Sequence, residues 1–209
     1  NYMNKITPEQ VLEALKIEVP ILNIYQYGSR VYGCNKPDAD FDFIIVTKSL
    51  CLPSGAFRQN AISSESRLYQ GTLFGRSGFI DAINNYEMSV WECLSLPEEF
   101  IVKKTIDFKP TKWNEKEMVK KVITKASNSF HIADLQAKDY QTPAAKKGTF
   151  QALRILMFGL QLKKYQKIVD YSEANYLRER FDSMDDDDFD TRDYMPMRDV
   201  LIAELKNGV

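Results

Sequence analysis

Residues 27–46 read YGSRVYGCNKPDADFDFIIV. A Gly-Ser pair opens this run, and two aspartates near its end lead into the apolar tail Phe43–Val46. Branched and aromatic residues at Ile21–Tyr27 predict a strand that enters the Gly-Ser turn, and Asp40–Val46 predicts a second strand. Because the tail is apolar at consecutive positions, we expect the second strand to be central in a sheet, with both of its faces buried.

The flanking sequence predicts a first helix and two more strands. Residues 7–10 read Thr-Pro-Glu-Gln, which is the pattern of a capping box with proline at the first helical position. Residues 47–66 are mixed and polar, so they predict a loop. Arg67–Phe74 and Phe79–Ile83 predict two strands joined by a hairpin-like connection at residues 75–78.

The second half of the chain has helical periodicity. Apolar residues at helical spacing predict one helix between Asn85 and Pro97 and two long, packed helices over Met118–Ala137 and Phe150–Lys164. Shorter helices are expected at Ser172–Phe181 and Pro196–Leu205. Strands followed by helices are typical of an α+β unit with a helical subdomain after it.

Composition limits the class of protein. No apolar run approaches the roughly 18 to 20 residues that cross a bilayer, and the polar N-terminus lacks a signal-peptide core, so we expect a soluble, cytoplasmic protein without a membrane partner. Three cysteines without close pairing, Cys34, Cys51 and Cys93, favour reduced thiols. The chain has a single histidine, His131, so a structural zinc site is not expected. His131 falls in a helical pattern.

Charge is distributed unevenly along the chain although the formal net charge is only -1. Residues 103–167 hold 15 Lys/Arg against 5 Asp/Glu, and residues 170–199 hold 11 Asp/Glu against 4 Arg. The basic stretch is therefore where a polyanion is expected to bind. The acidic run Asp185–Asp188 lacks the glycine and terminal glutamate of a calcium loop, so we interpret it as a solvated loop.

The Gly-Ser turn has the residue types that hold phosphate. Gly28 lets the backbone approach a ligand, Ser29 adds a hydroxyl donor, and Arg30 offers a planar fork of N–H donors. A helix that starts after a strand would also present backbone N–H groups to phosphate oxygens. The turn is not a Walker A loop, because the Gly-Lys-Ser/Thr ending is missing.

Two aspartates supply metal-binding chemistry. Asp40 and Asp42 are two residues apart on a predicted strand, so their carboxylates point to the same face. Carboxylates in this arrangement bind one or two magnesium ions together with the phosphates of a nucleoside triphosphate, with the metals about 3.5 to 4 Å apart. A third carboxylate is needed to complete such a site. Asp81 is the best candidate, because it interrupts the apolar run Phe79–Ile83.

The Gly-Ser turn, the interval of ten residues, the Asp-Phe-Asp strand and the later aspartate resemble the nucleotidyltransferases of the DNA polymerase β superfamily. Residues 28–33 are also similar to the small stand-alone "predicted nucleotidyltransferase" branch, whose turn reads Gly-Ser-Arg-x-Tyr-Gly before an Asp-x-Asp strand. The resemblance is specific over Tyr25–Val46. It is weaker over Phe79–Phe100, where Ile80-Asp81-Ala82 and Trp91-Glu92-Cys93-Leu94 fit the same branch.

The resemblance implies a short mixed β-sheet with flanking helices as a catalytic core at residues 1–108, with a helical subdomain at 109–209 packed on it. It implies transfer of a nucleoside monophosphate from a triphosphate to an acceptor hydroxyl, with release of pyrophosphate and with Mg²⁺ or Mn²⁺ as cofactor. Asp40 and Asp42 would hold the metals. Asp81 would complete the metal site and help to deprotonate the acceptor, while Gly28 and Ser29 hold the triphosphate.

Several alternatives stay open at this point. Lys147 and Arg154 lie seven residues apart on one helix face, where they either contact nucleotide or form a solvated basic face. Arg30 and Tyr32 either contact substrate or serve as a surface charge and a packing residue. The acceptor is an RNA end, including that of a transfer RNA, or AMP is transferred to a protein or small-molecule hydroxyl. A non-catalytic nucleotide-binding regulatory module is the third hypothesis.

Overall fold

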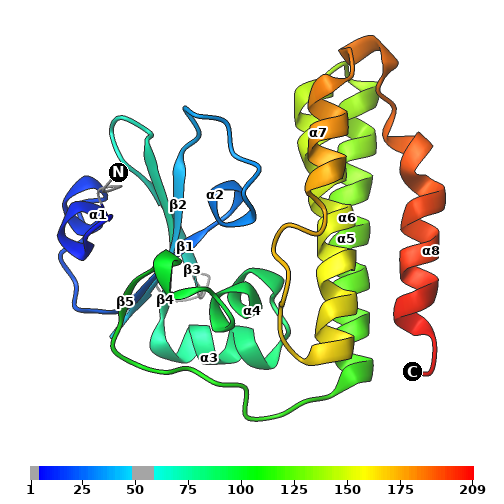
Figure 1. The fold of residues 1–209 in the computed structure, drawn as a ribbon. Helices are drawn as coiled ribbons and strands as arrows, with labels where there is room; N and C mark the ends of the chain where they lie inside the picture. The colour runs from blue at the N-terminus through cyan, green and yellow to red at the C-terminus, as the bar shows by residue number, and fades with distance from the viewer. Residues whose placement is uncertain (1–4, 49–58) are drawn as a thin grey trace. The chain divides into compact units, whose positions relative to one another are not determined.

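The computed structural model describes residues 5–48 and 59–209, which form two compact units. As far as they are described, the first unit comprises Asn1–Val31, Asn35–Asn84 and Ser89–Thr111, and the second comprises Tyr32–Cys34, Asn85–Met88 and Lys112–Val209. All strands of the described residues belong to the first unit, and four helices of the chain's second half belong to the second (Figure 1). The predicted α+β fold with a helical region after the sheet is confirmed.

The first unit is built on a five-stranded mixed sheet with the strand order β3-β4-β2-β1-β5. The strands are β1 (Ile21–Tyr27), β2 (Phe41–Thr47), β3 (Gln59–Ser63), β4 (Tyr69–Gly75) and β5 (Ile101–Lys104). Strand β2 pairs in parallel with β4, and the other neighbours pair antiparallel. Since β2 lies in the middle and Phe43–Val46 are at most 2% exposed, the prediction of a central, doubly buried strand is confirmed.

Helices cover both faces of this sheet. Helix α1 (Pro8–Ala14) begins with the predicted capping box, because the Thr7 side chain accepts from the backbone of Gln10 and the Gln10 side chain accepts from the backbone of Thr7. Its Val11 packs in a cluster with residues of β1, β2 and β4. On the other face, the ring of Phe79 stacks on Tyr25 of β1 at 6.0 Å. The helix that carries Phe79 therefore lies opposite α1 (Figure 1).

That helix is a correction to the sequence analysis. Phe79–Ile83 was predicted to be a strand of a hairpin, but it lies within α3 (Arg76–Asn84). Phe79, Ala82 and Ile83 are buried, and their spacing of three and four residues is the period of a helix, so the sheet-facing side of α3 is apolar. Helix α4 (Met88–Leu94) follows, and its Trp91 indole N–H donates to the Ile83 carbonyl at 3.0 Å.

Two strands, one short helix and one 3₁₀ turn were not predicted. Strand β3 lies in the stretch 47–66 that was interpreted as a loop, of which residues 49–58 lie outside the described part of the chain. Strand β5 follows a short 3₁₀ turn at Glu98–Phe100. Helix α2 (Ser29–Tyr32) is only four residues long. Elements of this length carry too few residues for a periodic pattern to identify them.

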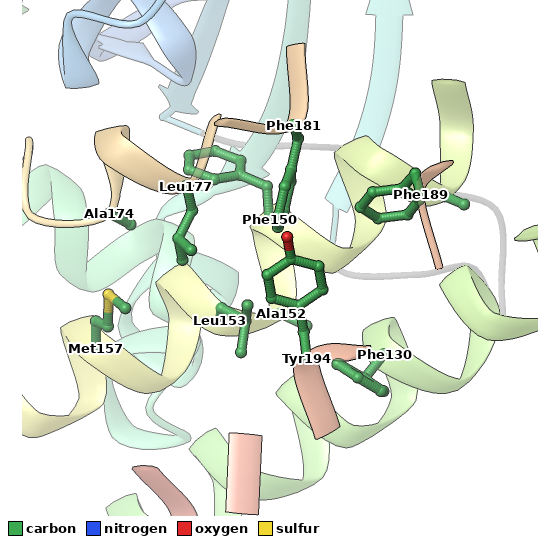
Figure 2. Close-up of a cluster of buried hydrophobic side chains, with 11 residues drawn as sticks. Phe130, Phe150, Ala152, Leu153, Met157, Ala174, Leu177, Phe181, Phe189 and Tyr194 are labelled. Atoms are coloured by element: carbon green, nitrogen blue, oxygen red, sulfur yellow. The ribbon is translucent and has the colours of Figure 1, made fainter. Parts of the chain in front are cut away.

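The second unit is built on two long helices, as predicted. They are α5 (Glu115–Lys138) and α6 (Thr142–Tyr165), followed by α7 (Asn175–Ser183) and α8 (Met195–Lys206). The two long helices approach closely at Gly159, where a Cβ would lie 2.6 Å from Val122 Cγ1. Figure 2 shows the hydrophobic core of this unit, in which the ring centroids of Phe181 and Tyr194 are 4.7 Å apart.

Other predictions about single residues can be placed. The acidic run that was interpreted as a solvated loop contains an exposed 3₁₀ turn at Asp186–Asp188. Lys146 Nζ forms an ion pair with Asp186 Oδ1 at 3.0 Å. His131 is exposed on α5. Cys34 and Cys93 are free thiols, and Cys51 lies outside the described residues.

Over residues 5–48 and 59–209, we find no helix with the length and apolar character needed to cross a bilayer.

Candidate functional site

The Gly-Ser turn lies in close contact with Asp42, one of the two predicted metal ligands. Gly28 has φ = +83°, and a Cβ placed on it would lie 2.8 Å from Asp42 Oδ2. The turn is closed by a hydrogen bond from the Val31 N–H to the Gly28 carbonyl at 2.9 Å. A side chain at position 28 would therefore strain the backbone and displace the Asp42 carboxylate, so glycine is favoured here.

Asp42 lies where three strands meet. In the sheet register, Asp42 is opposite Tyr27 at the end of β1 and opposite Gln70 near the start of β4. Phe43 belongs to the cluster beneath α1, so alternation along the strand directs the half-buried Asp42 to the other face of the sheet. The end of β1, the start of β2 and the start of β4 lie side by side, so their polar groups gather at the same end of these three strands.

Asp40 precedes β2 and is exposed. Its Oδ2 accepts a hydrogen bond from Gln70 Nε2 at 2.9 Å. The side chain of Gln70 therefore contacts one predicted ligand, and its backbone pairs with the other. Asp40, Asp42 and Gln70 form a group that we call the strand-edge cluster.

Arg30 holds the loop that carries Asp40. Its Nη2 donates to the Ala39 carbonyl at 2.5 Å, and its Nε donates to the Asp40 carbonyl at 3.3 Å. Its guanidinium carbon also lies 3.7 Å from the centroid of the Phe41 ring. These contacts give Arg30 a role in positioning the strand-edge cluster, while its predicted contact with phosphate stays a prediction.

Asp81 is not brought into this cluster. It lies on α3 rather than on a neighbouring strand, because the predicted strand is a helix. Asp40, Asp42 and Asp81 all belong to the described residues, and within that part of the chain no group of three or more His, Cys, Asp or Glu side chains is arranged to hold a metal ion. The prediction of Asp81 as the third carboxylate thus gains no support from its position.

Gln70 is the residue that sequence reasoning missed. It takes the place on the neighbouring strand where a third carboxylate was expected, but its amide is uncharged. The residues around it, Tyr69 and Gly71, gave no local signal, because the relation to Asp42 depends on the parallel pairing of β2 with β4. Gln70 becomes identifiable only when the strand register is known.

The remaining predicted nucleotide contacts belong to the second unit. Lys147 is exposed on α6, whereas Arg154 is only 4% exposed and its guanidinium carbon lies 4.5 Å from the centroid of the Tyr32 ring. Tyr32 is itself buried, and its carbonyl accepts from Asn175 Nδ2 at 2.7 Å. Arg154 therefore does not lie on a solvated face, and Tyr32 packs within this unit. Nucleotide contact by Lys147 or Arg154 stays a prediction.

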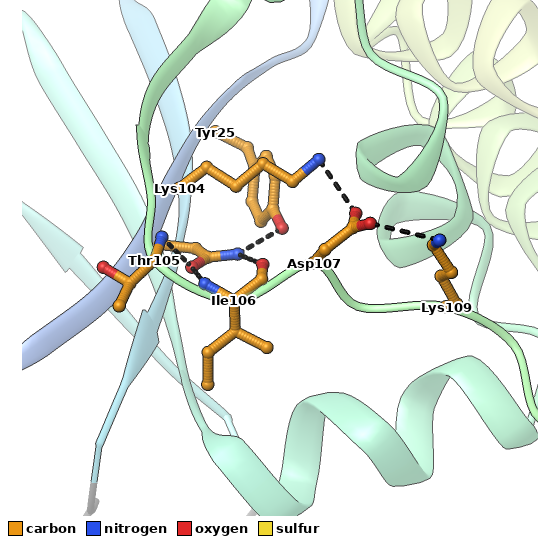
Figure 3. Close-up of polar contacts among 7 residues, drawn as sticks. Tyr25, Lys104, Thr105, Ile106, Asp107 and Lys109 are labelled. Carbon is orange, nitrogen blue, oxygen red and sulfur yellow. Dashed lines mark hydrogen bonds and ion pairs between the residues drawn. The ribbon is translucent and has the colours of Figure 1, made fainter.

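A second polar cluster lies four residues before the end of β1. The Asn23 side chain is fully buried, its Oδ1 accepts from the N–H groups of Thr105 and Ile106 at 3.0 Å each, and its Nδ2 donates to the Ile106 carbonyl at 2.8 Å and to the Tyr25 hydroxyl at 2.6 Å (Figure 3). Burial raises the pKa of Tyr25 to about 12. Beside this group, Asp107 lies between Lys104 and Lys109, which lower the pKa of its carboxyl.

Comparison with known proteins gives a distant likeness to a solved structure. No protein-family model matches the sequence, and no curated protein matches it. Among solved structures, the chain is similar to a nucleotidyltransferase-like protein from Exiguobacterium sibiricum 255-15, with 10% identity and a TM-score of 0.34, over 94% of this chain and 72% of that one.

Proposed function

We propose that the first unit binds a nucleoside triphosphate with a divalent cation and transfers its nucleoside monophosphate to an acceptor hydroxyl, releasing pyrophosphate. The observation that carries the proposal is the contact between Gly28 and Asp42, where a Cβ would lie 2.8 Å from the carboxylate oxygen. This contact joins a turn suited to phosphate to a carboxylate suited to magnesium. The positive φ alone accounts for a glycine in the turn, and the proposal depends on the closeness of the carboxylate to it.

The residues fit a divalent cation. Asp40 and Asp42 supply carboxylate oxygens, which are the ligands that Mg²⁺ and Mn²⁺ prefer, and both lie beside Gln70. A bound cation would neutralise charge that builds on the phosphate oxygens during transfer. The Gly28 backbone leaves room for the triphosphate, the Ser29 hydroxyl donates to it, and Arg30 keeps the Asp40 loop in place.

An RNA end is the acceptor that we favour. Exposed lysines occur along α5, namely Lys116, Lys120, Lys121 and Lys125. Cations on one long helix are suited to the phosphates of an RNA chain, whose binding releases counterions and so weakens steeply with salt. Transfer of AMP to a protein or small-molecule hydroxyl would use the same cluster but would not depend on these lysines.

A second candidate is a nucleotide-binding module without turnover. It is favoured by the strand-edge cluster itself, where Gln70 rather than an acid accompanies the two aspartates. An amide does not accept a proton from an acceptor hydroxyl at neutral pH. Binding of triphosphate without transfer would then be the biological output.

The test uses the purified chain with each α-labelled nucleoside triphosphate, Mg²⁺ or Mn²⁺, and total cellular RNA and protein, resolved on a denaturing gel. Label in RNA supports the favoured acceptor, and label in protein supports AMP transfer. Asp42→Asn is the negative control. Binding of triphosphate without any label would favour the regulatory module, and absence of binding would refute the proposal.

A further inference from the structure

Gln70 stands out because a carboxylate in its place would complete the expected metal site. It pairs with Asp42 in the parallel register of β2 and β4, and its Nε2 donates to Asp40 Oδ2 at 2.9 Å. A glutamate at this position would differ by the replacement of one NH₂ group by oxygen. The side chain is therefore in place while its charge is absent.

The missing charge has an electrostatic consequence. The carboxylates of Asp40 and Asp42 carry two formal negative charges, which balance one divalent cation. A bound triphosphate brings one cation with it, so a second cation about 3.5 to 4 Å away, which the first repels, would need a further anionic ligand from the protein. Within the described residues no third acidic, His or Cys side chain joins these two in a metal-holding group.

The hydrogen bond to Asp40 adds a positioning role. Asp40 is exposed and lies before the start of β2, so neither burial nor strand pairing holds its side chain. Hydrogen bonds from other residues must position its carboxylate. Gln70 on β4 constrains the Oδ2 atom, and Arg30 constrains the backbone carbonyl of the same residue. Glutamine thus holds the first ligand in place without competing with it for a cation.

We infer that Gln70 restricts the strand-edge cluster to a single divalent cation, the one that arrives with the triphosphate, and that it serves as the positioning residue for Asp40. This inference rests on the proposed function, because it concerns the same site. It goes beyond that proposal by giving the metal count and the residue that sets it. Replacing Gln70 by glutamate is expected to create the second cation site.

The experiment is electron paramagnetic resonance of Mn²⁺ bound to the full chain with a non-hydrolysable triphosphate analogue. Two Mn²⁺ ions about 3.5 to 4 Å apart give an exchange-coupled spectrum, whereas one gives an uncoupled spectrum. Wild type is expected to show only the uncoupled signal. Gln70→Glu is expected to show the coupled signal, with affinity for the second ion raised at least about tenfold.

Gln70→Leu is the matched control, because it removes the hydrogen bond to Asp40 without adding charge. It is expected to keep one uncoupled Mn²⁺ and to bind it more weakly than wild type. A coupled signal from wild type would overturn the inference while leaving the proposed function standing, as would a folded Gln70→Glu protein that stays uncoupled. If wild type bound neither Mn²⁺ nor the analogue, the proposed function itself would fail. The wild-type spectrum decides the metal count even if Gln70→Glu does not fold.

Discussion

Two polar clusters lie beside strand β1, and they differ in how their polar groups are satisfied. One is centred on Asn23 near the start of the strand, and the other is the strand-edge cluster, whose Asp42 pairs with Tyr27 at the end of the strand. At Asn23, the donor and acceptor atoms of one fully buried amide all meet partners of the opposite kind. At the other end, the Gln70 amide donates to the Asp40 carboxylate, and Gly28 with φ = +83° approaches the Asp42 carboxylate. The first arrangement is complete by itself, because every buried polar atom of the amide is paired.

The second arrangement places two carboxylates beside a glycine in the left-handed conformation. Bringing like charges together costs free energy, and the left-handed conformation favours glycine at position 28. Such features are often found at functional sites. The comparison favours a structural role for the Asn23 cluster and is consistent with our proposal that the strand-edge cluster binds a cation and a phosphate. The predictions below test that division of roles.

The largest effect is expected for Asp42→Asn. Removing this carboxylate should weaken Mn²⁺ binding by more than about 100-fold, since loss of a direct ligand exceeds the 10- to 100-fold effect of outer-sphere partners. Thermal stability should stay close to that of wild type, because Asn keeps the shape and removes charge repulsion. Calorimetric titration with Mn²⁺ and a melting curve measure both quantities. Unchanged Mn²⁺ affinity would show that Asp42 is not a ligand.

Gly28→Ala is expected to disturb the same site by its backbone. The added Cβ would lie 2.8 Å from Asp42 Oδ2 at a φ of +83°, so triphosphate binding should be lost and stability should fall by about 1–3 kcal/mol. Gly33→Ala is the matched control: its φ is +82°, but the nearest atom to its Cβ is 3.9 Å away. The control should show a similar loss of stability in urea and retain binding. Equal binding by both variants would separate Gly28 from the site.

Asn23→Ala is expected to show the reverse pattern. It leaves the N–H groups of Thr105 and Ile106 without their acceptor inside the protein, which should lower the free energy of unfolding by about 2–4 kcal/mol. Mn²⁺ affinity of the folded protein should not change. Urea unfolding and Mn²⁺ titration check the two expectations, with the exposed Asn128→Ala as control. A loss of metal binding without a loss of stability would invert the assigned roles.

The smallest effect is an alkaline pH dependence from Tyr25. Its folded-state pKa is raised to about 12, whereas an unfolded tyrosine ionises near pH 10, so the stabilisation is present below about pH 10. It should be lost by up to about 1.4 kcal/mol per pH unit between about pH 10 and 12. The measurement is the difference in unfolding free energy between wild type and Tyr25→Phe across that range. A constant difference would mean that Tyr25 is not shielded from solvent.

The sequence predicted those features that depend on neighbours along the chain. The capping box of Thr7 and Gln10, the central strand β2 and the two long helices follow from local patterns and are confirmed. Gly28 and Asp42 lie close together although they are 14 residues apart in the sequence, and the sequence had assigned both residues to one candidate site.

The features that sequence reasoning missed depend on pairing between distant segments. Gln70 lies 30 residues from the aspartate that it contacts, and only the parallel register of β2 and β4 brings it there. Asp81 was placed on a strand because short apolar runs are compatible with a helix or a strand, and the burial of Phe79, Ala82 and Ile83 shows the helical period. The strand predicted there was therefore wrong, and the role of Asp81 as a third carboxylate stays a prediction.

The central claim is that the strand-edge cluster binds a nucleoside triphosphate through a divalent cation. The most direct measurement is calorimetric titration of each triphosphate into the wild-type chain and into the double variant Asp40→Asn/Asp42→Asn, with Mg²⁺ and with EDTA. We predict one triphosphate bound per wild-type chain with Mg²⁺, and loss of binding both in EDTA and in the double variant. Binding that survives EDTA and the double replacement, or no binding of any triphosphate to wild type, would contradict the claim.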